Sequence, residues 1–96
     1  MKGAVYIVNI VKSASAGTME SSDVYVEIEP GTGGLEVQLE SVVQGQFGEA
    51  IREVVCEVLT DCGVSNATVR VVDRGALDCV IRARVETAIN RGKGEA

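Results

Sequence analysis

The chain has 96 residues, enough for one domain whose single core buries roughly 60 to 65 % of the surface of the unfolded chain, and a second domain is excluded. Its formal net charge of −5 argues against a nucleic-acid-binding surface, because such a surface needs clustered basic side chains. Hydrophobic residues make up 46 % and aromatic residues only 3 %, so valine, isoleucine and leucine must build the core, a composition that suits strands.

The side chains that many enzymes use for covalent catalysis are scarce. The chain has no histidine, which excludes a Ser/His/Asp or Cys/His relay because both need an imidazole. Cys56, Cys62 and Cys79 are odd in number and lack Cys-x-x-Cys spacing, so they indicate neither a disulfide framework nor a zinc site. We expect them to be reduced and buried in a cytoplasmic protein that has no intrinsic enzyme activity and binds no metal.

Residues 1–15 are expected to form an N-terminal extension. The β-branched residues within 5–11 favour an extra edge strand, and a tail that packs on a neighbouring molecule is an equal alternative. Lys2, the apolar run that follows it and the small residues 14–16 also resemble a short signal peptide, but Asn9 interrupts the run. No stretch approaches the roughly 18 apolar residues of a membrane span, so no membrane partner is expected.

Residues 12–22 should be irregular, exposed and mobile, because small and hydroxyl-bearing residues bury little surface and compete for backbone hydrogen bonds. The octet 16–23, Ala-Gly-Thr-Met-Glu-Ser-Ser-Asp, crowds hydroxyls, acids and small residues together. Such a cluster is most often only a loop. A serine in a mobile polar loop also suits a group attached after synthesis, which makes these hydroxyls the best candidates for chemistry.

Three strands are expected after this loop. Segments 23–29 and 35–40 alternate between apolar and polar residues, as half-buried strands do. The connector 30–34, Pro-Gly-Thr-Gly-Gly, is rich in turn formers, so the two segments predict a β-hairpin with a five-residue loop. The third strand is expected at 67–73, with Val69 and Val71 as its inward residues.

Two amphipathic helices are expected, one before and one after the third strand in the sequence. The run 41–44, Ser-Val-Val-Gln, fits a capping box, which would start the first helix at its serine, and Gly63 supplies a left-handed stop. Asp73 is the predicted N-cap of the second helix, and Gly92 ends it. Residues 93–96 should be frayed.

The order strand, strand, helix, strand, helix predicts an α+β fold, a two-layer sandwich in which two helices cover one face of a small mixed sheet. The third strand can lie beside the first or the second, and we favour the first. The predicted core combines one sheet face with both helix stripes. Its members are Val24, Val26, Ile28, Leu35, Val37, Leu39, Phe47, Ile51, Val54, Val58, Val69, Val71, Leu77, Val80, Ile81 and Val85.

The octet resembles the modification segment of the citrate lyase acyl carrier protein (gamma subunit) family, in which Ala-Gly-Thr-x-Glu-Ser-Gly-Asp surrounds the serine that carries the prosthetic group. The matching serine is Ser21. Ser22 stands where the family usually has glycine, which leaves Ser22 as a less favoured second candidate. Segments 46–52 and 73–84 resemble the family in the same order, and the resemblance covers residues 16–92.

This resemblance implies that 16–92 is an acyl carrier domain whose Ser21 bears a covalently attached phosphoribosyl dephospho-coenzyme A, joined through a phosphodiester and ending in a thiol. The group would carry acetyl and citryl as thioesters between the transferase (alpha) and lyase (beta) subunits during citrate fermentation, as citrate is cleaved to acetate and oxaloacetate. A prosthetic-group transferase would attach it. Glu20 and Asp23 would face basic groups of these partners, or else serve loop solubility, with Asp23 bonding a local backbone N–H.

Two alternatives stay open. The related carrier subunit of malonate decarboxylase has a similar glycine-alanine junction and the same prosthetic group, although the octet matches citrate lyase better. The chain could instead be a non-catalytic α+β interaction module, in which residues 5–11 pair across a dimer.

Overall fold

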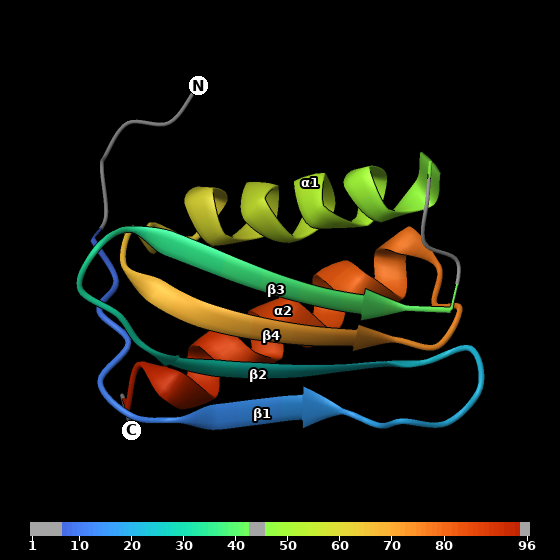
Figure 1. Ribbon diagram of the computed structural model, residues 1–96. Helices are drawn as coiled ribbons and strands as arrows, with labels where there is room; N and C mark the ends of the chain where they lie inside the picture. The colour runs from blue at the N-terminus through green and yellow to red at the C-terminus, as the bar shows by residue number, and fades with distance from the viewer. Residues whose placement is uncertain (1–6, 43–45, 95–96) are drawn as a thin grey trace.

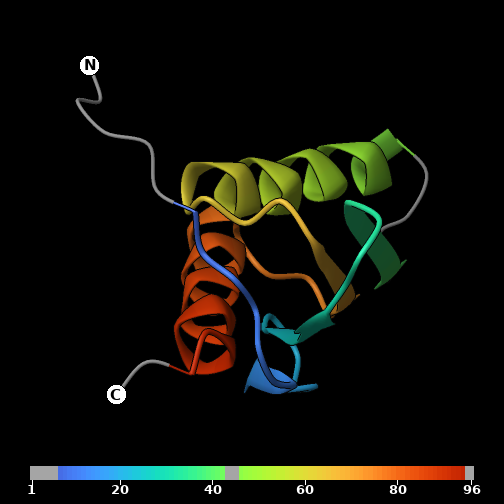
Figure 2. The ribbon, with the colours of Figure 1, turned by 90° about the vertical axis from the view of Figure 1, so that its left-hand side faces the viewer.

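The computed structural model describes residues 7–42 and 46–94, and the side chains of Gln46 and Phe47 lie outside the description. In chain order the elements are β1 (Ala14–Gly17), β2 (Val24–Pro30), β3 (Leu35–Ser41), α1 (Gln46–Asp61), β4 (Ala67–Asp73) and α2 (Asp78–Gly92) (Figure 1). Both helices cover the same face of one four-stranded sheet (Figure 2). Helix α1 packs against β3, and α2 packs against β1 and β2. The predicted α+β fold, with two helices on one face of a mixed sheet, is confirmed.

The sheet has the order β1-β2-β4-β3, with β4 antiparallel to β2 and parallel to β3. The third predicted strand is β4 and the first is β2, so the prediction that these two strands are neighbours is confirmed. The predicted hairpin is wrong, because β4 lies between β2 and β3. Strand β4 is the most buried of the four, and Val72 on its second face is buried together with Val69 and Val71, as suits a strand in the sheet interior rather than at an edge.

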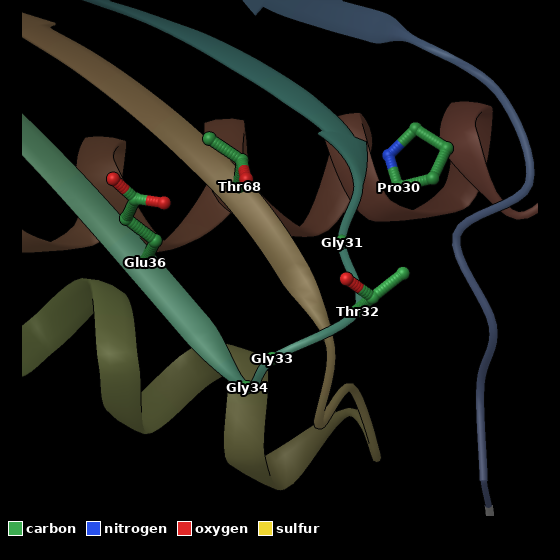
Figure 3. A pocket seen from close by; sticks show the side chains of 7 residues that line it. All are labelled: Pro30, Gly31, Thr32, Gly33, Gly34, Glu36 and Thr68. Atoms are coloured by element: carbon green, nitrogen blue, oxygen red, sulfur yellow. The ribbon is translucent and has the colours of Figure 1, made fainter.

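The glycine-rich connector from β2 to β3 crosses the beginning of β4 instead of closing a hairpin (Figure 3). The backbone of Gly34 accepts a hydrogen bond from the Ala67 N–H at 3.1 Å and donates one to Asn66 Oδ1 at 2.9 Å. A Cβ atom on Gly31 would lie 3.0 Å from backbone atoms of Ala67. Glycine at this position therefore serves the close crossing rather than a tight turn.

The edge strand lies later in the chain than expected. Of the predicted strand 5–11, residues 5 and 6 lie outside the described residues and 7–11 form no strand, whereas β1 lies within the segment 12–22 that was predicted to be irregular. The small residues of β1 let α2 approach, and Ala16 is only 4 % exposed. Residues 7–11 instead cover the ends of both helices. The Val8 N–H donates to Gly63 O and the Val11 N–H to Gly92 O, both at 2.9 Å.

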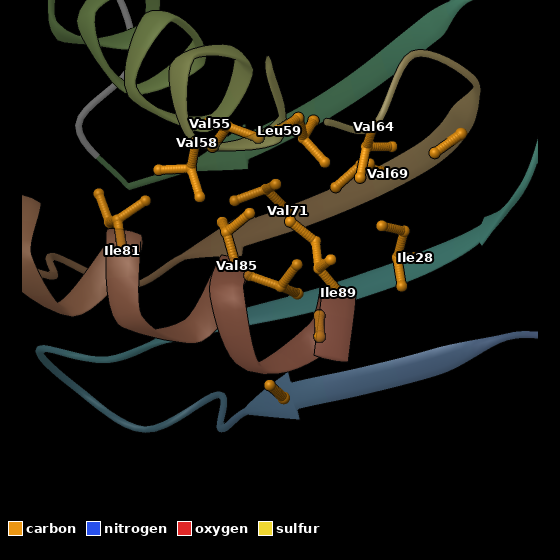
Figure 4. Close-up of a cluster of buried hydrophobic side chains, with 14 of the residues drawn as sticks. Ile28, Val55, Val58, Leu59, Val64, Val69, Val71, Ile81, Val85 and Ile89 are labelled. Carbon is orange, nitrogen blue, oxygen red and sulfur yellow. The ribbon is translucent and has the colours of Figure 1, made fainter. Parts of the chain in front are cut away.

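The hydrophobic core lies between the sheet and the helices, where side chains of β2, β4, α1 and α2 meet (Figure 4). Nine predicted core residues are buried: Val24, Val26, Ile28, Ile51, Val58, Val69, Val71, Ile81 and Val85. Five more are partly buried against them: Leu35, Val37, Leu39, Val54 and Val80. Leu77 is 71 % exposed, which contradicts its prediction, because it is the residue before α2 and not a member of the helix stripe. The predicted core side chain of Phe47 lies outside the described residues.

The helix cap predicted at Asp73 is wrong, because α2 begins only at Asp78. The capping box predicted from Ser41 stays a prediction, because residues 43–45 lie outside the described residues. Ser41 is the last residue of β3, and its Oγ donates to Asp73 Oδ2 at 2.8 Å. Asp73 ends β4, and its Oδ1 accepts the Ala76 N–H at 2.9 Å. Helix α2 begins at Asp78, and the N-cap residue before it makes no side-chain cap bond. Gln44, the fourth residue of the expected capping box, lies outside the described residues.

The predicted helix ends are confirmed. Gly63 has φ +84°, and the Val64 N–H donates to Leu59 O while the Gly63 N–H donates to Thr60 O, the pattern of a Schellman C-cap. Gly92 ends α2. Of the residues expected to be frayed, 95 and 96 lie outside the described residues. No helix in the described ranges has the length and apolar character needed to cross a membrane.

Truncating Leu59 should destabilise the domain strongly, because its side chain is fully buried beneath the sheet. We expect Leu59→Ala to lower the free energy of unfolding by about 2 to 5 kcal/mol in urea denaturation. Leu77→Ala removes the same atoms from an exposed position and should change it by less than about 0.5 kcal/mol. Equal losses for the two variants would contradict the assigned core.

Candidate functional site

The octet 16–23 divides into the end of β1 and the loop 18–23 that leads into β2. Ser21 and Ser22 are both exposed in this loop, and so are Thr18, Met19 and Glu20. The loop lies at the same end of the sheet as the connection from β4 to α2 (Figure 1). The predicted exposure of the two candidate serines is therefore confirmed, although only the later part of the segment 12–22 is irregular.

Two backbone hydrogen bonds fasten the loop to the β4–α2 connection. The Ser22 N–H donates to Arg74 O at 2.8 Å, and the Arg74 N–H donates to Asp23 O at 2.9 Å. A third bond, from the Asp23 N–H to Glu20 O at 3.1 Å, closes a tight turn around Ser21. Ser21 is thus presented at the tip of a short loop whose next residue is fixed to the sheet.

Ser22 has a backbone conformation that favours glycine. Its φ is +67°, in the left-handed region, and among the described residues other than glycine it alone has a positive φ. A side chain in this region costs roughly 1 to 2 kcal/mol, whereas glycine adopts it without steric penalty. This explains why a glycine is expected at the position from the resemblance, and it separates the two serines by their backbone roles.

The carboxylate of Asp23 is bound within the chain. Arg84 donates to it twice, from Nε to Oδ1 at 3.0 Å and from Nη2 to Oδ2 at 2.9 Å. Thr18 Oγ1 donates to Oδ2 at 2.7 Å, and the Val24 N–H donates to Oδ1 at 2.7 Å. The bonds from Arg84 and then Thr18 lower the pKa of Asp23 from 3.8 to about 2.

The two acids that are expected to meet partner proteins, Glu20 and Asp23, differ in exposure and in their contacts. The Asp23 side chain is only 15 % exposed, and its charge is compensated by Arg84. The alternative expectation, that Asp23 bonds a local backbone N–H, is confirmed by its bond to Val24. Glu20 is exposed at the loop tip, and its docking role stays a prediction.

The β4–α2 connection is a firm base for the loop. Asp73 is 1 % exposed and bonds both Ser41 Oγ and the Ala76 N–H, which fixes the connection against the end of β3. Sequence reasoning missed this base and missed Arg84, which is 61 residues from Asp23 in the chain. The only available signal was that 73–84 resembles the same family as the octet.

Other chemistry finds little support in the described residues. They contain no group of three His, Cys, Asp or Glu side chains that could hold a metal ion. All three cysteines are free, but Cys79 is exposed, contrary to its prediction, and Cys56 and Cys62 are only partly buried. Desolvation raises the pKa of the Cys62 thiol, so this group is a poor nucleophile. The exposed loop hydroxyls remain the candidates for attachment.

The Asp23–Arg84 pair should be visible in a pH titration. Replacing Arg84 with glutamine removes the largest cause of the shift, so the pKa of Asp23 should rise from about 2 toward 3.8 when its carboxyl carbon is followed by NMR. Arg82→Gln is the matched control, because Arg82 lies on the same helix and pairs with Glu57 instead. An Asp23 pKa that Arg84→Gln leaves in place would contradict the pairing.

The same pair makes stability depend on pH in a defined window. Because the pKa of Asp23 is lower in the folded state, the pair stabilises the fold above pH about 4 and loses this contribution as the pH falls toward about 2. The difference in unfolding free energy between the wild type and Arg84→Gln should therefore shrink across this window in urea titrations.

The comparisons with known proteins agree over most of the chain. A family model described as "ACP: Malonate decarboxylase delta subunit (MdcD)" matches residues 11–92. The citrate lyase acyl carrier protein of Streptococcus uberis is 45 % identical over 86 residues, which cover 90 % of this chain and 85 % of that protein. The citrate lyase acyl carrier protein of Vibrio cholerae is 54 % identical over 83 residues, which cover 85 % of each.

A solved structure shares the fold. It is a chain of a Pseudomonas malonate decarboxylase hetero-tetramer in complex with malonate, with a TM-score of 0.74, 26 % sequence identity, and coverage of 92 % of this chain and 91 % of that chain. Sequence identity and fold thus point to carrier subunits of multi-subunit complexes. With an exposed serine in the loop before β2 and no catalytic relay, the chain belongs to the acyl carrier protein family that includes the citrate lyase acyl carrier proteins and the malonate decarboxylase delta subunit.

Proposed function

We propose that this chain is the acyl carrier subunit of a citrate lyase and that Ser21 is the residue to which phosphoribosyl dephospho-coenzyme A is attached. The observation that carries the proposal is the exposed Ser21 at the tip of an anchored loop, in a chain 45–54 % identical to citrate lyase acyl carrier proteins. Ser22 is the less favoured candidate, because its backbone is held in the left-handed region and its N–H is bound to Arg74.

The residues around Ser21 fit such an attachment. A phosphodiester needs a free hydroxyl and room for a modifying enzyme, and Ser21 is exposed between Glu20 and Ser22, which are exposed too. No hydrogen bond to the Ser21 hydroxyl occurs among the described residues, so the hydroxyl is not committed to the fold. When bound, the group would supply a thiol that carries acetyl or citryl as a thioester.

The chain itself would hold the attached group and present it to the catalytic subunits, and it would not catalyse the reaction. Strand β4 and the bonds from Arg74 fix the base of the loop, while Ser21 at its tip stays accessible. Tethering a substrate at a fixed point raises its effective concentration at successive active sites, here those of the transferase (alpha) and lyase (beta) subunits. The net reaction would be the cleavage of citrate to acetate and oxaloacetate, with the chemistry performed by those subunits.

The degree of identity favours citrate lyase over malonate decarboxylase. The chain is 45–54 % identical to the citrate lyase carriers but 26 % identical to the chain of the malonate decarboxylase structure. Reconstitution separates the two functions. The modified chain should restore citrate cleavage to citrate lyase alpha and beta subunits and should not restore malonate decarboxylation; the reverse result would replace the proposed function.

Replacing Ser21 should abolish attachment without unfolding the domain. A loop hydroxyl contributes at most about 1 kcal/mol, so Ser21→Ala should keep its stability within that range. Coexpressed with a citrate lyase prosthetic-group transferase, the wild type should gain the mass of the group on the peptide that contains Ser21, and Ser21→Ala should gain none.

Ser22→Gly is the matched control, because glycine suits the positive φ at this position. It should be modified like the wild type, and its free energy of unfolding should equal that of the wild type or exceed it by up to about 2 kcal/mol, because glycine relieves the steric cost at this position. An adduct on Ser22 of the wild type or of Ser21→Ala would overturn the assignment of Ser21 but would leave the carrier function standing. The absence of any adduct beside a competent transferase would refute the carrier function.

A further inference from the structure

Arg74 differs from the other arginines of the chain. Five of the six arginines donate to acceptors of the protein itself: Arg52 to Val37 O, Arg70 to Glu27, Arg82 to Glu57, Arg84 to Asp23 and Arg91 to Ser15 O. Within residues 7–42 and 46–94, the Arg74 guanidinium has no hydrogen bond or ion pair, and the residue is exposed. Its charge is therefore not used by the described part of the fold.

Arg74 is also the residue to which loop 18–23, the proposed attachment loop, is hydrogen-bonded. Its backbone accepts from the Ser22 N–H at 2.8 Å and donates to Asp23 O at 2.9 Å, so it lies directly beside the residue that follows Ser21. An arginine side chain is long and flexible, which brings groups on the neighbouring strand connection within its reach. The unused guanidinium is thus tied to the loop that presents Ser21.

Asp23, whose backbone bonds Arg74, and Asp73, which precedes Arg74 in the chain, both have other partners. Asp23 is held by Arg84 and Thr18, and Asp73 is buried with its oxygens bonded to Ser41 and the Ala76 N–H. Glu20, at the loop tip, is exposed and forms no ion pair within the described ranges. Within the described residues the Arg74 guanidinium therefore has no fixed counter-ion.

We propose that the Arg74 guanidinium binds the phosphate groups of the prosthetic group attached at Ser21, the linking phosphodiester first among them. The proposal rests on the proposed function, since it needs that group. A guanidinium can donate two parallel hydrogen bonds to phosphate oxygens, and charge-assisted bonds of this kind are about twice as strong as neutral ones. Arg74 would thus hold the base of the attached group against the β4–α2 connection.

The direct test is NMR of the carrier before and after attachment, with modification verified by intact mass. The Arg74 Nε–Hε signal, identified by its loss in Arg74→Gln, should shift and exchange more slowly with water once the group is attached. The Arg82 signal is the internal control and should not change, because Arg82 pairs with Glu57 on α1. The ³¹P signal of the phosphodiester should differ between the modified wild type and modified Arg74→Gln.

Attachment kinetics give a second readout. Losing one charge-assisted bond should lower kcat/KM for prosthetic-group transfer by about tenfold in Arg74→Gln, and Arg74→Lys should recover part of it because it keeps the charge without the two-pronged geometry. Arg82→Gln should stay within about twofold of the wild type. Arg74→Gln should fold normally, since its exposed side chain has no partner in the described part of the fold.

The outcomes separate this inference from the proposed function. If the wild type acquires no adduct, both fail. If the adduct forms but the Arg74 and ³¹P signals do not respond, the phosphate contact is refuted and the carrier function stands. If Arg74→Gln slows transfer while these signals stay unchanged, Arg74 meets the transferase instead of the phosphate, and the inference is overturned.

Discussion

The pairing of β4 between β2 and β3 is the constraint on which the rest of the structure depends. A parallel β3–β4 pair cannot be closed by a short turn and needs a long crossover, which α1 supplies. The antiparallel β2–β4 pair brings the start of β2 beside the end of β4, where the Arg74 N–H donates to Asp23 O and the Ser22 N–H donates to Arg74 O. The loop 18–23 is therefore positioned by the most deeply buried strand of the sheet, although most of the loop is itself exposed.

Periodicity predicted the kinds of elements well because it reports which side of each element is buried. The alternation in β2 and the stripe in α2 were both realised, apart from residues at the element ends such as Leu77. Periodicity could not identify strand partners, since β2 and β3 are equally compatible with a hairpin and with a strand between them. The cap predicted at Asp73 failed for the same reason: its side chain suits a local cap, but it bonds Ser41, which is 32 residues away.

In the candidate site, too, the features set by neighbouring residues were predictable from the sequence, whereas those set by contacts between distant residues were not. The octet placed the exposed serines correctly, because a run of small and hydroxyl-bearing residues can bury little surface. Three features depend on the loop meeting the segment from β4 into α2: the left-handed backbone of Ser22, the Arg84 bridge to Asp23, and the position of Arg74, whose guanidinium has no ion pair within the described residues. Only the resemblance of 73–84 to the family signalled that this distant segment belonged to the site.

The placement of charge around Ser21 fits an acidic chain to the anionic prosthetic group that we propose for this serine. With a net charge of −5, the chain as a whole would disfavour phosphate groups, and Asp23 lies two residues from the proposed attachment point. Arg84 and Thr18 hold the pKa of Asp23 near 2, so this carboxylate stays ionised at neutral pH, and its pair with Arg84 carries no net charge. The charge of Arg84 is compensated by Asp23, whereas the Arg74 guanidinium has no ion pair within the described residues. Because surface charges farther away than about 8 to 10 Å are largely screened at physiological salt, the groups beside the loop outweigh the net charge of the chain in the field at Ser21.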